Sequence, residues 1–227
     1  LANEQVRVVF DGVDSAFYLW CNKSWVGYSQ DSRLPAEFDL TAYLRPGENS
    51  LKLVVFRYCD GSYLEDQDMW NLSGIFRSVS LLRKPQARIT DFRVTASLDD
   101  RYVDGVLDVQ VVTEDAQDCQ IALSLYNASD FSRPVMTMPP QGLGTRQIDE
   151  KGAYANRCEI TQSITSPQAW SAEEPALYRL TVSLLNRDGQ LIEAEASDVG
   201  FRRVETIAGQ LCLNGQPLLI RGVNKHE

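Results

Sequence analysis

Hydrophobic and polar residues alternate along most of the chain with a period of two. Short runs such as RVVFDG (7–12), AFYLWCN (16–22), LKLVVFRY (51–58) and FRSVSLLRK (76–84) are rich in Val, Tyr, Phe and Trp. Such alternation is typical of half-buried β-strands, in which successive side chains point to opposite faces. No 3.6-residue period is sustained between residues 1 and 84. The pattern therefore predicts a β-sandwich or jelly roll over residues 1–85.

A domain boundary is predicted at RKPQA (83–87), because Pro85 lacks the N–H group that a strand ladder needs. Further runs of the β type follow, from RITDFRVTASL (88–98) to QLIEAEASDVGFR (190–202). Roughly seven strands over about 115 residues match an immunoglobulin-like β-sandwich in size and rhythm. We therefore predict this second sandwich over residues 86–203.

The last stretch, GQLCLNGQPLLIRGVN (209–224), predicts the start of a third domain over residues 204–227. Asn214 and Gly215 stand between two apolar runs, which indicates a type I′ hairpin turn. The second run is continuously apolar, as in a strand buried on both faces. Such a strand would bring His226 to the rim of a site that the chain, ending at Glu227, does not complete.

Composition narrows the classes of function. The sequence is 44% hydrophobic and 23% charged, as in globular proteins, and its net charge is −9 without a basic block. This charge argues against nucleic acid or an anionic membrane surface as a partner. No apolar stretch approaches the length of a membrane span. The five cysteines form no CxxC pair and there is a single histidine, which argues against structural zinc and favours the reducing cytoplasm.

The densest group of polar residues is the segment YCDGSYLEDQDMWNLSGIF (58–76), called here the acidic segment. Asp60, Glu65, Asp66 and Asp68 precede Trp70 in a loop between two predicted strands. Carboxylates accept hydrogen bonds from sugar hydroxyls or hold a hard cation, and an indole covers an apolar ring face. The alternative is a solvated acidic loop whose tryptophan folds back onto the sandwich.

Two further hypotheses concern acid–base chemistry. Glycoside hydrolysis needs two carboxylates roughly 5–10 Å apart, but Glu65 and Asp68 share one loop and cannot flank a bond from opposite sides. His226 is the one side chain with an ordinary pKa near neutrality. It is either structural or, if the preceding run opens an α/β barrel, part of the site-bearing face. No nucleophile elbow, phosphate loop, dinucleotide fingerprint or HExxH motif is present.

Residues 11–85, from DGVDSAFYLWCN (11–22) through DGSYLEDQDMWNLSGIFR (60–77) to SVSLLRKP (78–85), resemble the sugar-binding jelly roll of bacterial β-galactosidases of glycoside hydrolase family two. Residues 170–205 resemble the end of that family's immunoglobulin-like second domain, and PLLIRGVNKHE (217–227) resembles the entry to its catalytic barrel. The resemblance implies a mostly β chain: an incomplete jelly-roll β-sandwich, an immunoglobulin-like β-sandwich and the first hairpin and strand of a TIM barrel. The motif DQDMW (66–70) resembles that of the β-galactosidase branch of the family more than those of the β-glucuronidase or β-mannosidase branches.

The resemblance also implies roles for four residues. Asp68 matches a carboxylate that contacts the galactosyl unit and binds a sodium ion, and His226 matches a histidine that hydrogen-bonds the galactosyl hydroxyls. Gln30 and Asp60 match two ligands of a peripheral magnesium site. Its other ligands come from an N-terminal segment that this sequence lacks.

In the family, both catalytic glutamates lie on barrel strands beyond the HE motif, so the resemblance implies no catalytic residue in this sequence. It implies an internal fragment, inactive alone, of a retaining β-galactosidase that hydrolyses terminal β-D-galactosides such as lactose. The full-length protein is expected to be a cytoplasmic homo-oligomer. Two alternatives stay open: a non-catalytic carbohydrate-binding protein, and a sibling β-glycosidase with another sugar preference.

Overall fold

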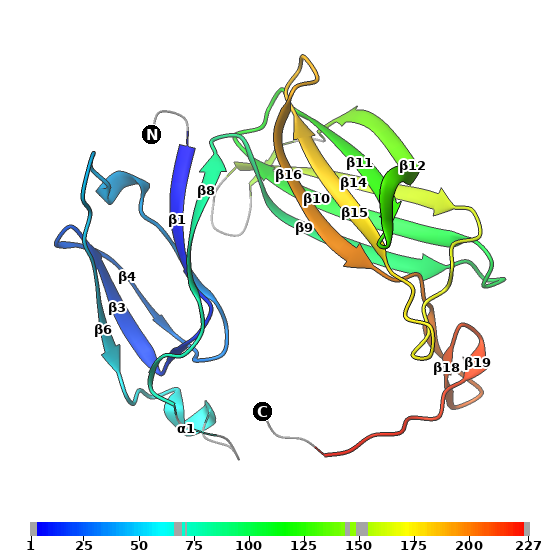
Figure 1. Ribbon diagram of the computed structural model, residues 1–227, viewed down its shortest axis with the longest axis horizontal. Helices are drawn as coiled ribbons and strands as arrows, with labels where there is room; N and C mark the ends of the chain where they lie inside the picture. The colour runs from blue at the N-terminus through cyan, green and yellow to red at the C-terminus, as the bar shows by residue number, and fades with distance from the viewer. Residues whose placement is uncertain (1–3, 66–69, 71, 144–145, 149–153, 225–227) are drawn as a thin grey trace. The chain divides into compact units, whose positions relative to one another are not determined.

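The computed structural model describes residues 4–65, 70, 72–143, 146–148 and 154–224. The described residues are mostly strand, with one 3-10 turn and one short helix (Figure 1). None of their helices has the length and apolarity that crossing a membrane requires. The chain divides into two compact units, residues 1–86 with 222–227, and residues 87–221.

The first unit is a small β-sandwich. Its elements are β1 (Glu4–Phe10), β2 (Val13–Asp14), β3 (Ala16–Cys21), β4 (Ser24–Gln30), β5 (Ala36–Asp39), η1 (Thr41–Tyr43), β6 (Leu51–Phe56), α1 (Ser62–Glu65), β7 (Gly74–Ile75) and β8 (Val79–Pro85). One sheet has the order β5-β1-β8, the other β4-β3-β6, and β2 pairs with β7. The strands predicted from alternation in residues 7–84 are confirmed.

The core of the first unit follows from the period of two. In β3, Phe17 and Leu19 are buried, whereas Tyr18 between them is half-buried on the other face. In β1, Val8 and Phe10 are buried in the same phase, and the ring centroids of Phe10 and Phe17 lie 5.0 Å apart. The two sheets therefore pack through these inward faces, as in other sandwiches.

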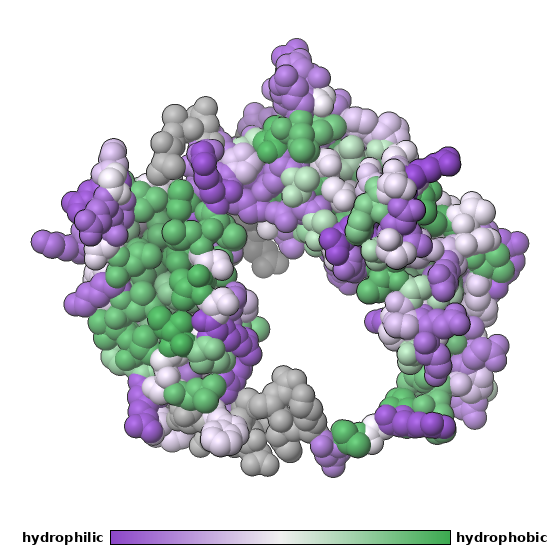
Figure 2. All heavy atoms as spheres, in the orientation of Figure 1, coloured by the Kyte–Doolittle hydropathy of each residue, from purple (hydrophilic) through white to green (hydrophobic). Residues whose placement is uncertain are grey.

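The outward face of the sheet β4-β3-β6 is unusually aromatic. The ring centroid of Tyr18 lies 5.2 Å from Trp25, 5.3 Å from Tyr28 and 4.9 Å from Phe56. Trp25, Tyr28 and Phe56 are exposed. Figure 2 shows hydrophobic residues gathered on the visible side of the first unit. An apolar face of this kind favours aggregation of the isolated chain.

The second unit is a larger two-sheet sandwich. Its strands are β9 (Arg88–Leu98), β10 (Gly105–Glu114), β11 (Gln120–Asn127), β12 (Asp130–Gly142), β13 (Arg146–Ile148), β14 (Tyr154–Ile164), β15 (Tyr178–Leu185) and β16 (Leu191–Val199). The sheet orders are β13-β14-β10-β9 and β12-β11-β15-β16. In β10, Leu107, Val109 and Val111 are buried, whereas Asp108 and Gln110 face outward. This arrangement agrees with the second sandwich that the sequence predicts.

A small sheet of β17 (Val204–Ile207), β18 (Gln210–Leu213) and β19 (Gln216–Pro217) follows. Asn214 and Gly215 connect its last two strands with φ values of 51° and 75°. Positive φ at both central residues is what a type I′ turn requires. The predicted Asn-Gly hairpin is therefore confirmed.

The prediction of a buried barrel strand in PLLIRGVN is wrong for this chain. Residues 218–224 have no regular secondary structure, and Leu219 is 76% exposed. A strand buried on both faces needs partner strands and covering layers, and the described residues provide neither for this run. The start of a TIM barrel in residues 204–227 remains a prediction.

Candidate functional site

The acidic segment connects β6 to β7 in the first unit. Its described part contains the short helix α1 and the exposed Asp60, and it reaches β7 at Gly74. Asp66 and Asp68 lie outside the described residues, as does His226. The two predicted sugar-contacting residues, Asp68 and His226, are therefore not placed. The described part of the candidate site consists of the residues that attach the acidic segment to the sandwich.

Glu65 fixes the first half of the acidic segment. Its Oε1 accepts a hydrogen bond from the backbone N–H of Ser32 at 3.1 Å, and its Oε2 accepts one from the Ser32 hydroxyl at 2.5 Å. Both oxygens of the carboxylate are thus engaged within the protein. This speaks further against Glu65 as a general acid or base and makes it a structural anchor.

Asp14 fixes the second half. The residue is 6% exposed, and its Oδ2 accepts hydrogen bonds from the backbone N–H groups of Leu72 at 3.1 Å and Ser73 at 3.3 Å. The Ser32 hydroxyl lies 3.4 Å from its Oδ1. Because Ser32 also contacts Glu65, one serine between two carboxylates ties both halves of the segment to the sandwich.

Trp70 is held by its backbone and not by its ring. Its carbonyl accepts a hydrogen bond from Arg33 Nη2 at 3.3 Å, and the Arg33 carbonyl accepts one from Arg77 Nη1 at 2.8 Å. The residue is 83% exposed. The alternative in which the tryptophan folds back onto the sandwich is therefore wrong, and the indole face is open to a ligand.

The proposed magnesium ligands lie beside a tyrosine. The Tyr28 hydroxyl donates to Gln30 Oε1 at 2.7 Å, and the pKa of Tyr28 is raised by burial and by the nearby Cys59 and Asp60. Oxygen donors such as Gln30 and Asp60 suit magnesium. Within the described part of the chain, however, no group of three or more His, Cys, Asp or Glu side chains could hold a metal. The two residues do not make a metal site by themselves, and the magnesium site stays a prediction.

Sequence reasoning missed Asp14, Ser32 and Arg33. The available signal was Asp14 itself, which stands in the run VDSAF beside residues that are buried. A carboxylate in a buried strand needs hydrogen-bond partners, so its presence indicates a polar network. The sequence alone could not show which distant residues supply that network.

Both units match models of known protein families. Residues 1–85 match the model of the glycosyl hydrolases family 2, sugar binding domain, and residues 87–202 match the model of glycosyl hydrolases family 2. The chain belongs to glycosyl hydrolases family 2. The mostly β fold inferred from the resemblance is therefore that of the sugar-binding and immunoglobulin-like domains of this family.

Curated relatives in the family are named β-galactosidase. The chain is 56% identical to one from Aeromonas hydrophila over 227 residues, and 53% identical to one from Enterobacter cloacae over 229 residues. In both cases the match covers 100% of this chain and 22% of the relative. The chain therefore spans about a fifth of the length of these proteins.

Solved structures of the family share the fold at low sequence identity. A family 2 member from Bacteroides cellulosilyticus has a TM-score of 0.80 at 22% identity, over 97% of this chain and 29% of that one. Bacteroides uniformis β-glucuronidase 3 has a TM-score of 0.80 at 18% identity, over 97% and 28%. At such identities the similarity shows the fold alone.

Proposed function

We propose that this chain forms the sugar-binding and immunoglobulin-like part of a β-galactosidase that hydrolyses terminal β-D-galactosides such as lactose. The observation that carries the proposal is 51–56% identity to bacterial β-galactosidases along the whole chain. The family 2 structures similar in fold include β-glucuronidases, but only at identities near 20%. Hydrolysis itself is proposed for the longer protein to which such a segment belongs, called here the parent.

Within the parent, this segment positions the sugar and does not break the glycosidic bond. Asp68 contacts the galactosyl unit and His226 hydrogen-bonds its hydroxyls, whereas two glutamates outside this chain act as acid and nucleophile in a retaining mechanism. Holding the sugar in a reactive orientation lowers the entropic part of the barrier. The anchors Asp14 and Glu65 support this role, because they fix the segment before and after Asp68.

A bound sodium ion would add a fixed positive charge beside the sugar hydroxyls. The carboxylate of Asp68 is a hard oxygen donor of the kind that such cations prefer. Gln30 and Asp60 would contribute oxygen ligands to magnesium together with residues from elsewhere in the parent. These ion assignments follow from the resemblance and are part of the proposal.

We also propose a cytoplasmic location and a homo-oligomeric parent. All five cysteines are free thiols, and Cys21, Cys158 and Cys212 are buried. Burial raises the pKa of the Cys21 and Cys158 thiols, which keeps them protonated and unreactive. Unpaired thiols of this kind are usual in a reducing compartment.

Substitution of the sugar-contacting residues tests the positioning role. In the parent, Asp68→Asn and His226→Gln are each expected to lower kcat/KM for an aryl β-galactoside about tenfold, because a misplaced sugar reacts more slowly. The matched control is Asp188→Asn, at an exposed aspartate in the turn between β15 and β16. Unchanged kcat/KM in both site variants would contradict the assignment.

A further inference from the structure

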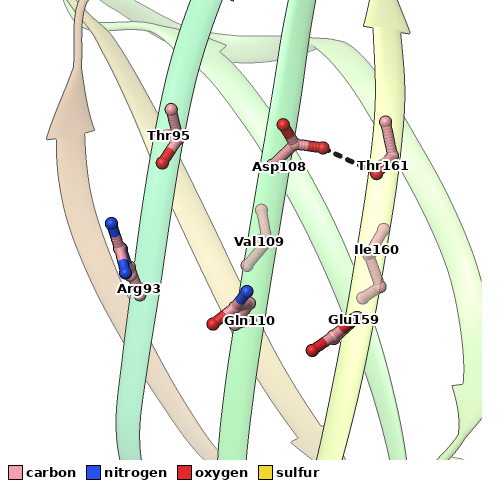
Figure 3. Close-up of a pocket in the computed structure, with 8 residues that line it drawn as sticks. All are labelled: Arg93, Thr95, Asp108, Val109, Gln110, Glu159, Ile160 and Thr161. Atoms are coloured by element: carbon pink, nitrogen blue, oxygen red, sulfur yellow. Dashed lines mark hydrogen bonds between the residues drawn. The ribbon is translucent and has the colours of Figure 1, made fainter.

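The outward face of the strands β9, β10 and β14 in the second unit is polar and hollowed (Figure 3). Two rows of side chains cross this face, and each row contains one residue from each of the three strands. The first row is Arg93, Gln110 and Glu159, and the second is Thr95, Asp108 and Thr161. The hollow that they line measures about 300 Å³. These six side chains are exposed, and the core lies on the opposite side of the sheet.

Four charges on this face alternate in sign. In the row of Gln110, β9 carries Arg93 and β14 carries Glu159; in the adjacent row, β9 carries Asp91 and β14 carries Arg157. All four residues are exposed. No hydrogen bond or ion pair joins any of these four side chains to another described residue. The charges thus form a square with opposite signs at neighbouring corners, and no side chain among the described residues pairs with it.

This pattern is complementary to itself. A two-fold axis that runs parallel to the strands above β10 places β9 of one copy opposite β14 of the other. Arg93 then faces the partner's Glu159, and Asp91 faces the partner's Arg157. Two-fold symmetry repeats both pairs, so that four ion pairs of opposite charge surround the axis.

The residues along the axis are compatible with this arrangement. Gln110 meets its own copy, and two amides can exchange hydrogen bonds because each carries both donors and acceptors. Val112 also meets its own copy and gives an apolar contact. Asp108 and Glu114 each meet a like charge. Asp108 accepts a hydrogen bond from Thr161 at 2.6 Å and borders the hollow, where water can separate the carboxylates, and Glu114 forms an ion pair with Arg88 of its own chain.

We propose that this face docks onto the same face of a second copy of the chain, sheet against sheet. Two sheets pack in this way with their strands within about 30° of each other. Ion pairs at an exposed interface set orientation and association rate more than affinity, and salt screens them. The expected complex is therefore a weak, salt-sensitive dimer, and it does not depend on the proposed β-galactosidase activity.

Sedimentation velocity of the 227-residue chain over a concentration series tests the proposal. At about 0.05 M salt the chain should form dimers, and at about 0.5 M the dimer fraction should fall. Arg93→Glu turns two attractive pairs into repulsive ones, so the dissociation constant should rise about tenfold or more. Arg157→Glu, at another corner, should act in the same way and replaces the first variant if that one fails to fold.

Two double variants that keep the wild-type net charge test which residues face each other across the proposed two-fold axis. Arg93→Glu with Glu159→Arg restores every pair across the proposed axis, so dimers should return. Arg93→Glu with Asp91→Arg makes every such pair repulsive, so dimers should stay absent. The proposal is overturned if the chain is monomeric throughout, if the second double variant dimerises instead of the first, or if assembly is indifferent to both salt and Arg93→Glu. The last result would point to the aromatic face of the first unit.

Discussion

Replacing Phe201 by alanine is expected to lower the free energy of unfolding of the second unit by about 3–5 kcal/mol. The Phe201 side chain is 0% exposed, and its ring centroid lies 5.4 Å from that of Tyr178 with an interplanar angle of 77°. A Cβ atom added to Gly105 would lie 2.8 Å from the Phe201 ring, which shows how closely the strand packs against it. Removing the ring therefore leaves a cavity between two sheets that can close only in part.

Hydrogen exchange of the backbone amides of β10 and β15 measures this effect, because slow exchange in core strands reports unfolding of their own unit. Phe131→Ala is the matched control, since Phe131 is 55% exposed and packs against Tyr126 and Arg179 at the surface. It is expected to cost less than about 1 kcal/mol. Equal losses in the two variants would contradict the packing described for Phe201.

Replacing Asp14 by alanine is expected to destabilise the first unit by about 2–3 kcal/mol. The change removes the acceptor for the backbone N–H groups of Leu72 and Ser73 and leaves a void where a buried carboxylate stood. The Ser32 hydroxyl loses a neighbour as well, so the tie between the two halves of the acidic segment is weakened. The segment should therefore open more readily than the strands around it.

Exchange of the amides in β1 and β3 reports the stability of the first unit in this variant. Asp14→Asn is the matched control, because its amide oxygen still accepts a hydrogen bond while its volume is nearly unchanged. Its cost should be less than half that of alanine. If asparagine and alanine had the same effect, the hydrogen bonds from Leu72 and Ser73 would not be what Asp14 contributes.

The two sandwiches could be predicted from the sequence because each strand buries one face. Burial of one face makes hydrophobic and polar residues alternate along the strand. It did not predict β12, whose run DFSRPVMTMPPQG contains three prolines. Proline is tolerated in edge strands, where its missing N–H has no partner to satisfy. Among the described strands, β12 pairs with β11 alone and is such an edge. A local pattern cannot show which strand will lie at an edge.

The prediction for the run PLLIRGVN was wrong because the local pattern indicated more burial than the described chain provides. Its apolar composition predicts burial, but burial depends on partners that the described chain does not provide, and Leu219 and Ile220 are exposed. The anchors Asp14 and Ser32 were also beyond sequence reasoning, since the hydrogen bond between Ser32 and Glu65 joins residues 33 positions apart. Asp68 and His226 were candidates from the sequence alone, but their sugar-binding roles were inferred only through resemblance to a family.

We propose that this chain belongs to an enzyme specific for β-galactosides. The most direct test is kcat/KM of the parent for the nitrophenyl β-galactoside and for the corresponding β-glucuronide. We predict a preference for the galactoside of about a hundredfold or more, because a site that hydrogen-bonds specific hydroxyls discriminates strongly between sugars. Comparable values, a preference for the glucuronide, or sugar binding without hydrolysis would contradict the account.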